Sequence, residues 1–124
     1  MPMVRVSNGG TASLIPQKGK YLTVEIPKGN FSDMNNMTEG TMANSLAFSE
    51  ASNKGRLVIF NVSNYQSVQV SNMIYSSCYI IGSTESKAGG LAANTTYSLA
   101  NAEFLCVYLG GSSSGTLTYN FTFT

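Results

Sequence analysis

The sequence predicts an all-β protein, an antiparallel β-sandwich of jelly-roll type with short strands and one long irregular loop. Three observations support this prediction. About nine stretches alternate apolar and polar residues or are rich in β-branched and aromatic residues, turn residues separate them, and no stretch has the period of an amphipathic helix. With 124 residues, the chain is expected to form a single domain, residues 1–124, around one modest core.

The first part of the chain contains three strand candidates. Residues 3–7 and 12–15 are short, and an Asn-Gly-Gly turn separates them. Residues 20–26 are a clearer strand that a Pro-Lys-Gly-Asn sequence ends. The alternation of this strand predicts one face with Leu22, Val24 and Ile26 and another with Tyr21, Thr23 and Glu25.

Residues 31–55 are the least regular part of the sequence. We expect a loop followed by a short strand at 45–50, where Leu46 and Phe48 alternate with polar residues. The alternative is a helical turn, because Met42 and Leu46 are four residues apart. Long loops carry function, make assembly contacts or are mobile. The favoured interpretation is a surface loop whose methionines cover the edge of a sheet.

The strand signal is stronger from residue 56 onward. Residues 56–62, 67–71, 73–81 and 95–99 are predicted strands because they combine β-branched and aromatic residues with alternation. Residues 82–90 are polar and rich in glycine and serine, which predicts a turn region.

The last two predicted strands are residues 103–109 and 116–124. The Gly/Ser-rich segment 110–115 between them is suited to a hairpin connection. In 103–109 both faces are apolar, so this strand is either central in a two-layer structure or covered by another subunit. In the terminal strand one face is rich in threonine, and the other face is predicted to lie in the core: Leu117, Tyr119, Phe121 and Phe123.

The composition removes the commonest catalytic chemistries. The chain has no histidine, which excludes Ser-His-Asp and Cys-His arrangements and histidine metal sites. The six carboxylates form no tight local motif, there is no Cys-x-x-Cys pair, and a single aspartate excludes an Asp-rich calcium loop. Segment 110–115 has two glycines at P-loop spacing but no lysine after them. We therefore expect no enzymatic activity, no cofactor and no metal.

The charge balance indicates a protein that tolerates self-association. Charged residues are 10% of the chain and the formal net charge is +1, whereas Ser, Thr, Asn and Gly supply 52 of the 124 residues. Little charge repulsion then opposes assembly. The excess of lysine and arginine in residues 1–30 is weak, and solvated lysines at a sheet edge explain it. Nucleic-acid binding is therefore not predicted.

Neither membrane insertion nor ordinary secretion is predicted. No apolar run approaches the roughly 18 residues of a membrane span, and the start of the sequence lacks a basic segment followed by an apolar one. Cys78 and Cys106 fall in predicted strands and are expected to be reduced, buried side chains; they pair only if those strands face each other. Five Asn-x-Ser/Thr sequons are expected by chance in this composition.

Three tyrosines are candidate ligand or partner contacts: Tyr65, in an Asn-Tyr-Gln turn, and Tyr75 and Tyr79, in a predicted strand. An exposed tyrosine ring offers an apolar platform with a polar hydroxyl to a sugar or a protein partner. Packing in the core or in an interface is the commoner role of a tyrosine.

The second half of the chain resembles a known class of proteins. The segments that carry the resemblance are residues 57–70 (LVIFNVSNYQSVQV), 78–82 (CYIIG), 97–109 (YSLANAEFLCVYL) and the terminal LTYNFTF strand. They are similar to the jelly-roll modules of tailed-bacteriophage virion proteins, namely head-decoration or head-fibre proteins and the galactose-binding-like domains of tail tips. The resemblance implies a non-enzymatic structural or adhesive role, often as a homotrimer. Residues 1–56 match no pattern, which leaves them open to docking on a capsid or tail.

The function expected from these observations is that of a virion structural protein of a tailed phage: capsid decoration, head fibre or tail component. Its partners would be further copies of itself, with a trimer favoured, and other virion proteins. It would be made in the host cytoplasm and reside in the virion. The alternative is a carbohydrate-binding module that recognises cell-surface glycans through exposed tyrosines and Asn or Gln side chains. A small hydrolase or lyase would need two glutamates brought together by folding.

Overall fold

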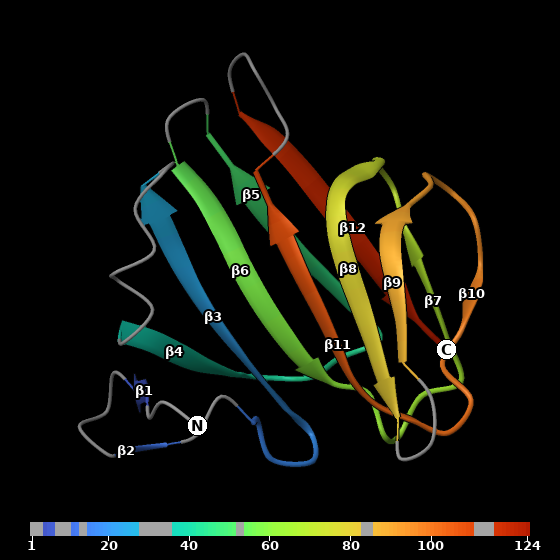
Figure 1. The fold of residues 1–124 in the computed structure, drawn as a ribbon, viewed down its shortest axis with the longest axis horizontal. Coiled ribbons are helices and arrows are strands. Elements are labelled where there is room, and N and C mark those ends of the chain that lie inside the picture. The colour runs from blue at the N-terminus through green and yellow to red at the C-terminus, as the bar shows by residue number, and fades with distance from the viewer. Residues whose placement is uncertain are drawn as a thin grey trace.

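Two β-sheets packed face to face form the described part of the computed structural model (Figure 1), which covers residues 4–6, 11–12, 15–27, 36–51, 54–82, 86–110 and 116–124. Within these ranges the chain forms strands and no helix. The strands are β1 (Val4–Val6), β2 (Thr11–Ala12), β3 (Lys20–Pro27), β4 (Asn36–Thr41), β5 (Ser45–Glu50), β6 (Lys54–Asn61), β7 (Ser67–Val70), β8 (Ile74–Gly82), β9 (Ser86–Leu91), β10 (Tyr97–Ser98), β11 (Ala102–Leu109) and β12 (Leu117–Phe123). The predicted all-β sandwich is confirmed, while its jelly-roll topology stays a prediction.

The two sheets differ in size. The large sheet has eight strands in the order β2-β1-β4-β3-β6-β11-β8-β9, and the small sheet has four in the order β10-β7-β12-β5. Neighbouring strands are antiparallel except β1 and β4, which are parallel. Figure 1 shows β5, β12 and β7 behind the large sheet, with β4 turning away from the direction of β3. The small sheet therefore covers only part of one face of the large one.

The main core lies between the sheets. The terminal strand β12 has the predicted alternation, because Tyr119, Phe121 and Phe123 are buried and the threonines and Asn120 between them are exposed. The ring of Phe60 on β6 lies 5.1 Å, centroid to centroid, from the rings of both Phe121 and Phe123. Burial of such large aromatic side chains stabilises this interface through the hydrophobic effect.

A second apolar cluster, here called the outer cluster, lies on the opposite face of the large sheet. It is formed by side chains of β3, β4 and β6: Leu22, Val24, Ile26, Met37 and Ile59. Alternate residues of β6 and β11 pack on opposite clusters, so Val107 belongs to the main core while Cys106 packs against the outer cluster. Of the two alternatives for strand 103–109, a central position or cover by another subunit, the structure shows the first, because β11 lies inside the large sheet between β6 and β8.

The predicted hairpin between residues 103–109 and 116–124 is wrong. Strand β11 pairs with β6 and β8 in the large sheet, whereas β12 pairs with β5 and β7 in the small sheet. The chain crosses between sheets here because each strand has an apolar face to bury and the two faces can meet only across the sandwich, where packed sheets lie about 10 Å apart. Residues 111–115 of the connection lie outside the described residues.

Two segments predicted to be irregular are strands. Within 31–55, β4 forms in addition to the predicted strand at 45–50, and Met37 is fully buried in the outer cluster. A Cβ at Gly40 would overlap the ring of Tyr21 on the neighbouring strand, so glycine allows that ring to lie across β4. Within 82–90, Ser86–Leu91 forms the edge strand β9, whose register with β8 is irregular. Pairing with a strong neighbour overrides the weak β propensity of both segments.

Candidate functional site

The largest exposed apolar side chains of the described residues include three from one strand. Tyr75 is 73% exposed, Tyr79 47% and Ile81 38%, and all three belong to β8. We call them the β8 surface. Buried Ile74 and Cys78 on the same strand face the main core. Strand β8 therefore buries one set of side chains and presents another to solvent.

The sheet register gives the β8 surface apolar neighbours. Tyr79 lies opposite Cys106, and Ile81 lies opposite Phe104, on the adjacent strand β11. Cys106 in turn lies opposite Ile59, which belongs to the outer cluster. Tyr79 and Ile81 therefore continue the row of apolar side chains on the outer face of the large sheet, whereas Tyr75 lies in the irregular stretch of β8 between Ile74 and Cys78. Exposed apolar surface of this kind typically marks a contact with a partner or ligand.

Of the three predicted contact residues, Tyr75 and Tyr79 are exposed on the same strand, whereas Tyr65 is placed elsewhere. The Tyr65 side chain is half-buried and packs against the main core, with its ring centroid 5.4 Å from that of Phe123. Its backbone N–H donates to the carbonyl of Val62, closing the turn after β6. The structure therefore gives Tyr65 a packing role in the turn and does not unite it with the β8 surface.

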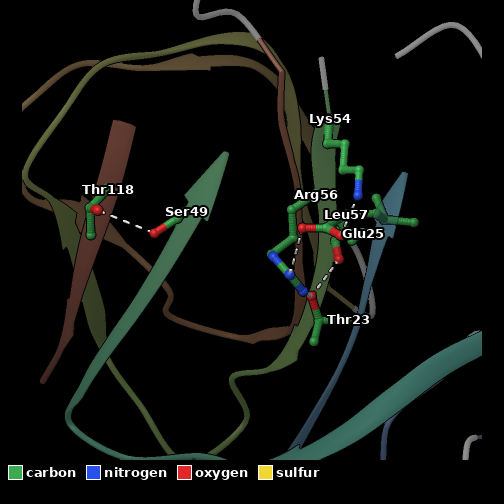
Figure 2. Close-up of polar contacts among 7 residues, drawn as sticks. All are labelled: Thr23, Glu25, Ser49, Lys54, Arg56, Leu57 and Thr118. Atoms are coloured by element: carbon green, nitrogen blue, oxygen red, sulfur yellow. Dashed lines mark hydrogen bonds and ion pairs between the residues drawn. The ribbon is translucent and has the colours of Figure 1, made fainter. Parts of the chain in front are cut away.

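A polar cluster lies on strands β3 and β6, away from β8 and on the inner face of the large sheet (Figure 2). Arg56 Nη1 donates to Thr23 Oγ1 at 3.1 Å, and Thr23 Oγ1 donates to the carbonyl of Leu57 at 2.9 Å. Glu25 forms ion pairs with Lys54 at 3.6 Å and with Arg56 at 3.7 Å. The Glu25 side chain is 52% exposed, so solvent screens both pairs and they add little stability.

This polar cluster does not provide catalytic chemistry. Glu25 is its one carboxylate, and both of its cationic neighbours are engaged with it. A glycosidase requires two carboxyl groups about 5 to 10 Å apart across the scissile bond. Among the residues the structure describes, no group of three or more Cys, Asp or Glu side chains is placed to hold a metal ion.

The sequence analysis missed a polar pair in the core. Glu50 on β5 and Tyr119 on β12 are each 2% exposed, and the Tyr119 hydroxyl donates to Glu50 Oε1. Burial, followed by the hydrogen bond to Glu50, raises the pKa of Tyr119 above its usual range. The sequence contained a sign of this pair, because Glu50 lies two residues after Phe48 and so falls on the same inward face of the strand as Leu46 and Phe48. A carboxylate in that phase needs a polar partner across the ladder.

The two cysteines occupy opposite faces of the large sheet. Cys106 lies opposite Tyr79 in the β8–β11 ladder, so it points away from the face on which Cys78 is buried in the main core. Both are free thiols. Burial raises the pKa of Cys78 to about 12 and that of Cys106 to about 11. Thiols with raised pKa values are poor nucleophiles at neutral pH, so both act as packing residues.

No protein-family model, curated protein or solved structure matches this chain. Within the described residues, no helix is long and apolar enough to cross a membrane.

Proposed function

We propose that this protein is a non-enzymatic structural component of a tailed-phage virion, a capsid decoration, head fibre or tail protein that acts through contacts with other proteins. The observation that carries the proposal is the β8 surface, an exposed pair of tyrosines and an isoleucine on a strand whose other face is fixed in the core. Tyrosine is enriched in protein interfaces because its ring packs while its hydroxyl stays solvated. The low net charge and the sequence resemblance described above agree with this role.

Virions purified from a lysate of the source phage test the proposal directly. Mass spectrometry of particles banded in a density gradient is expected to find this chain at a fixed ratio to the major capsid or tail protein. The combined change Tyr75→Ser and Tyr79→Ser is expected to reduce incorporation into particles at least tenfold while leaving the circular dichroism spectrum unchanged.

Ile15→Ser is the matched control, because Ile15 is 48% exposed and does not belong to the β8 surface. Incorporation of the control should equal that of the unmodified chain. Absence of the protein from purified particles would contradict the proposal, and equal incorporation of the double variant would remove the β8 surface from it.

A carbohydrate-binding role is the second candidate, and the exposure of Tyr75 and Tyr79 on one strand favours it. Four strand residues span roughly 13 Å, the length of two to three sugar rings, although the irregular register between Ile74 and Cys78 shortens this. Binding on a glycan array that is lost in Tyr75→Ala and in Tyr79→Ala would support this role. An array without signal at high protein concentration would count against it.

A further inference from the structure

The small sheet has an open edge at β5. Among the described residues, β5 pairs with β12 on one side and ends the strand order on the other, where Ala51, directly after β5, forms an isolated bridge with Lys54 of β6. The open part of this edge is therefore residues 45–49. Strand β5 is six residues long, with a regular register throughout its ladder with β12. Edge strands normally carry lysine, proline or a bulge that prevents them from pairing with another chain. The β5 sequence, SLAFSE, has no lysine, proline or bulge, and its one charged residue, Glu50, points inward at the end of the strand and accepts a hydrogen bond from Tyr119. By contrast, the edge strand β9 of the large sheet has Lys87, two glycines and an irregular register.

The ladder identifies which backbone groups point to the open edge. The carbonyl of Asn44 accepts from the N–H of Phe123 at 2.8 Å, so Asn44 and Phe123 occupy a hydrogen-bonded position of the ladder. Such positions alternate along an antiparallel ladder. The backbone groups of Leu46, Phe48 and Glu50 therefore point toward β12. Those of Ser45, Ala47 and Ser49 point outward, away from β12.

The side chains at this edge are also incompletely covered. Leu46 points into the sandwich yet is only half-buried, whereas Phe121, directly opposite on β12, is fully buried. Ser45, Ala47 and Ser49 are exposed on the outer face, small and uncharged. Ser49 shares a hydrogen bond with Thr118, so it already points along the outer face toward its own sheet (Figure 2).

From this geometry we propose that β5 is a self-association edge, at which β5 of a second copy adds antiparallel and continues the small sheet. A two-fold axis through Ala47 sets Ala47 opposite Ala47 of the other copy and Ser45 opposite Ser49. These residues are the ones whose backbone groups point outward, and each such pair exchanges two N–H···O bonds. The same register sets Leu46 opposite Phe48 of the second copy on the inward face, which covers the half-buried leucine.

The second copy is the occupant because this register pairs the outward backbone groups of Ser45, Ala47 and Ser49 with one another and sets each inward apolar side chain of β5 opposite another. An isologous contact of this kind closes at two copies. With a net charge of +1, the chain offers little electrostatic resistance to the pairing. This contact is separate from the β8 surface, which lies on a strand of the other sheet, so it stands whether or not the proposed virion role is correct.

Charge substitutions at the symmetry axis test the proposal. Sedimentation velocity of the unmodified chain is expected to show a concentration-dependent monomer–dimer equilibrium. Ala47→Lys places two like charges side by side at the axis and is expected to raise the dimer dissociation constant at least tenfold. Ala47→Glu is expected to do the same for the same reason. An equal mixture of these two variants is expected to restore a dimer, now a heterodimer, because opposite charges then face each other.

Thr122→Lys is the matched control, since Thr122 is exposed on the outer face one strand away from the edge. It adds the same charge without facing the second copy, and its dissociation constant should stay within about twofold of that of the unmodified chain. Circular dichroism of all variants confirms that they fold. An unmodified chain that is monomeric up to about 300 µM, or a dimer that persists in Ala47→Lys, would overturn the proposal.

Discussion

The hydrogen bond between Tyr119 and Glu50 is buried inside the sandwich. Both side chains are 2% exposed, on neighbouring strands β12 and β5 of the small sheet. A buried hydroxyl that donates to a carboxylate satisfies a group whose desolvation would otherwise be costly. At the scale of single residues, this pair ties the open-edge strand β5 to the centre of its sheet.

Removing the hydroxyl should therefore destabilise the fold. Tyr119→Phe is expected to lower the free energy of unfolding by about 1–3 kcal/mol, measured by urea denaturation. Tyr79→Phe removes the same hydroxyl from an exposed ring and should stay within about 0.5 kcal/mol of the unmodified chain. A double-mutant cycle with Glu50→Gln that gives no coupling energy between the two positions would contradict this role.

The two thiols, buried Cys78 and half-buried Cys106, make stability sensitive to alkaline pH. An exposed thiol has a pKa of 9.0, whereas burial raises that of Cys106 to about 11. Below pH 9 the thiol is protonated in both the folded and unfolded states, so the stability gained by burying the neutral thiol is fully present. Between pH 9 and pH 11 the unfolded chain releases a proton that the folded chain retains, and stability falls as the pH rises.

The loss from Cys106 alone is expected to be on the order of 2 kcal/mol by pH 11. Urea denaturation at pH 8 and pH 11 measures it, and Cys106→Ala should show a smaller decrease between the two values than the unmodified chain does. Cys78, with a pKa of about 12, acts in the same direction at higher pH. An equal decrease in the alanine variant would refute the assignment to this thiol.

At the scale of elements, β6 and β11 carry apolar residues on both faces. Each contributes to the core between the sheets and also to the apolar side chains on the outer face. A strand with two buried faces cannot slip by one residue without exchanging its two sets of side chains. These strands are therefore the part of the large sheet whose register is most firmly specified.

The outer cluster should behave as a true core despite lying on the outer face. Ile26 is fully buried there, and Ile26→Ala is expected to lower the free energy of unfolding by about 2–4 kcal/mol. Ile15→Ala makes the same chemical change at a residue that is 48% exposed, and it should cost less than about 0.5 kcal/mol. Similar costs for the two variants in thermal or urea denaturation would show that the outer cluster is not a core.

At the scale of the whole molecule, two sheets of unequal size leave different surfaces unfinished. The large sheet exposes the β8 surface, and the small sheet ends at β5 with outward backbone groups. One surface presents aromatic side chains and the other presents hydrogen-bonding backbone. Both are uncharged, so contacts at either should depend weakly on salt.

This weak dependence can be measured for the β5 dimer. Because its interface residues carry no charge at Ser45, Ala47 or Ser49, the dimer dissociation constant is expected to change less than about threefold between 50 mM and 500 mM salt. Sedimentation velocity in sodium chloride measures the change. A tenfold weakening at high salt would show that ion pairs, such as those of the Glu25 cluster, hold the copies together.

Much of the fold was predictable because strand alternation is a local property. The terminal strand buries Tyr119, Phe121 and Phe123 as its pattern predicts, and the two-faced character of 103–109 predicts its central position. Segments with weak patterns were not predictable: β4 and β9 are strands because strong neighbours, β3 and β8, supply their hydrogen-bond partners. The exposure of Tyr75 and Tyr79 agrees with the candidate site, whereas the half-buried position of Tyr65 depends on Phe123, which is distant in the sequence.

The sequence by itself determined the all-β class, which side chains of the strongest strands face inward, and the absence of histidine chemistry, because each depends on residue type and on spacing along the chain. Only the tertiary structure decided that β11 and β12 belong to different sheets, that the two cysteines lie on opposite faces, that Glu50 meets Tyr119, and that β5 ends its sheet. These depend on which strands pair. That choice is made by burying apolar faces from distant segments together, and local patterns do not encode it.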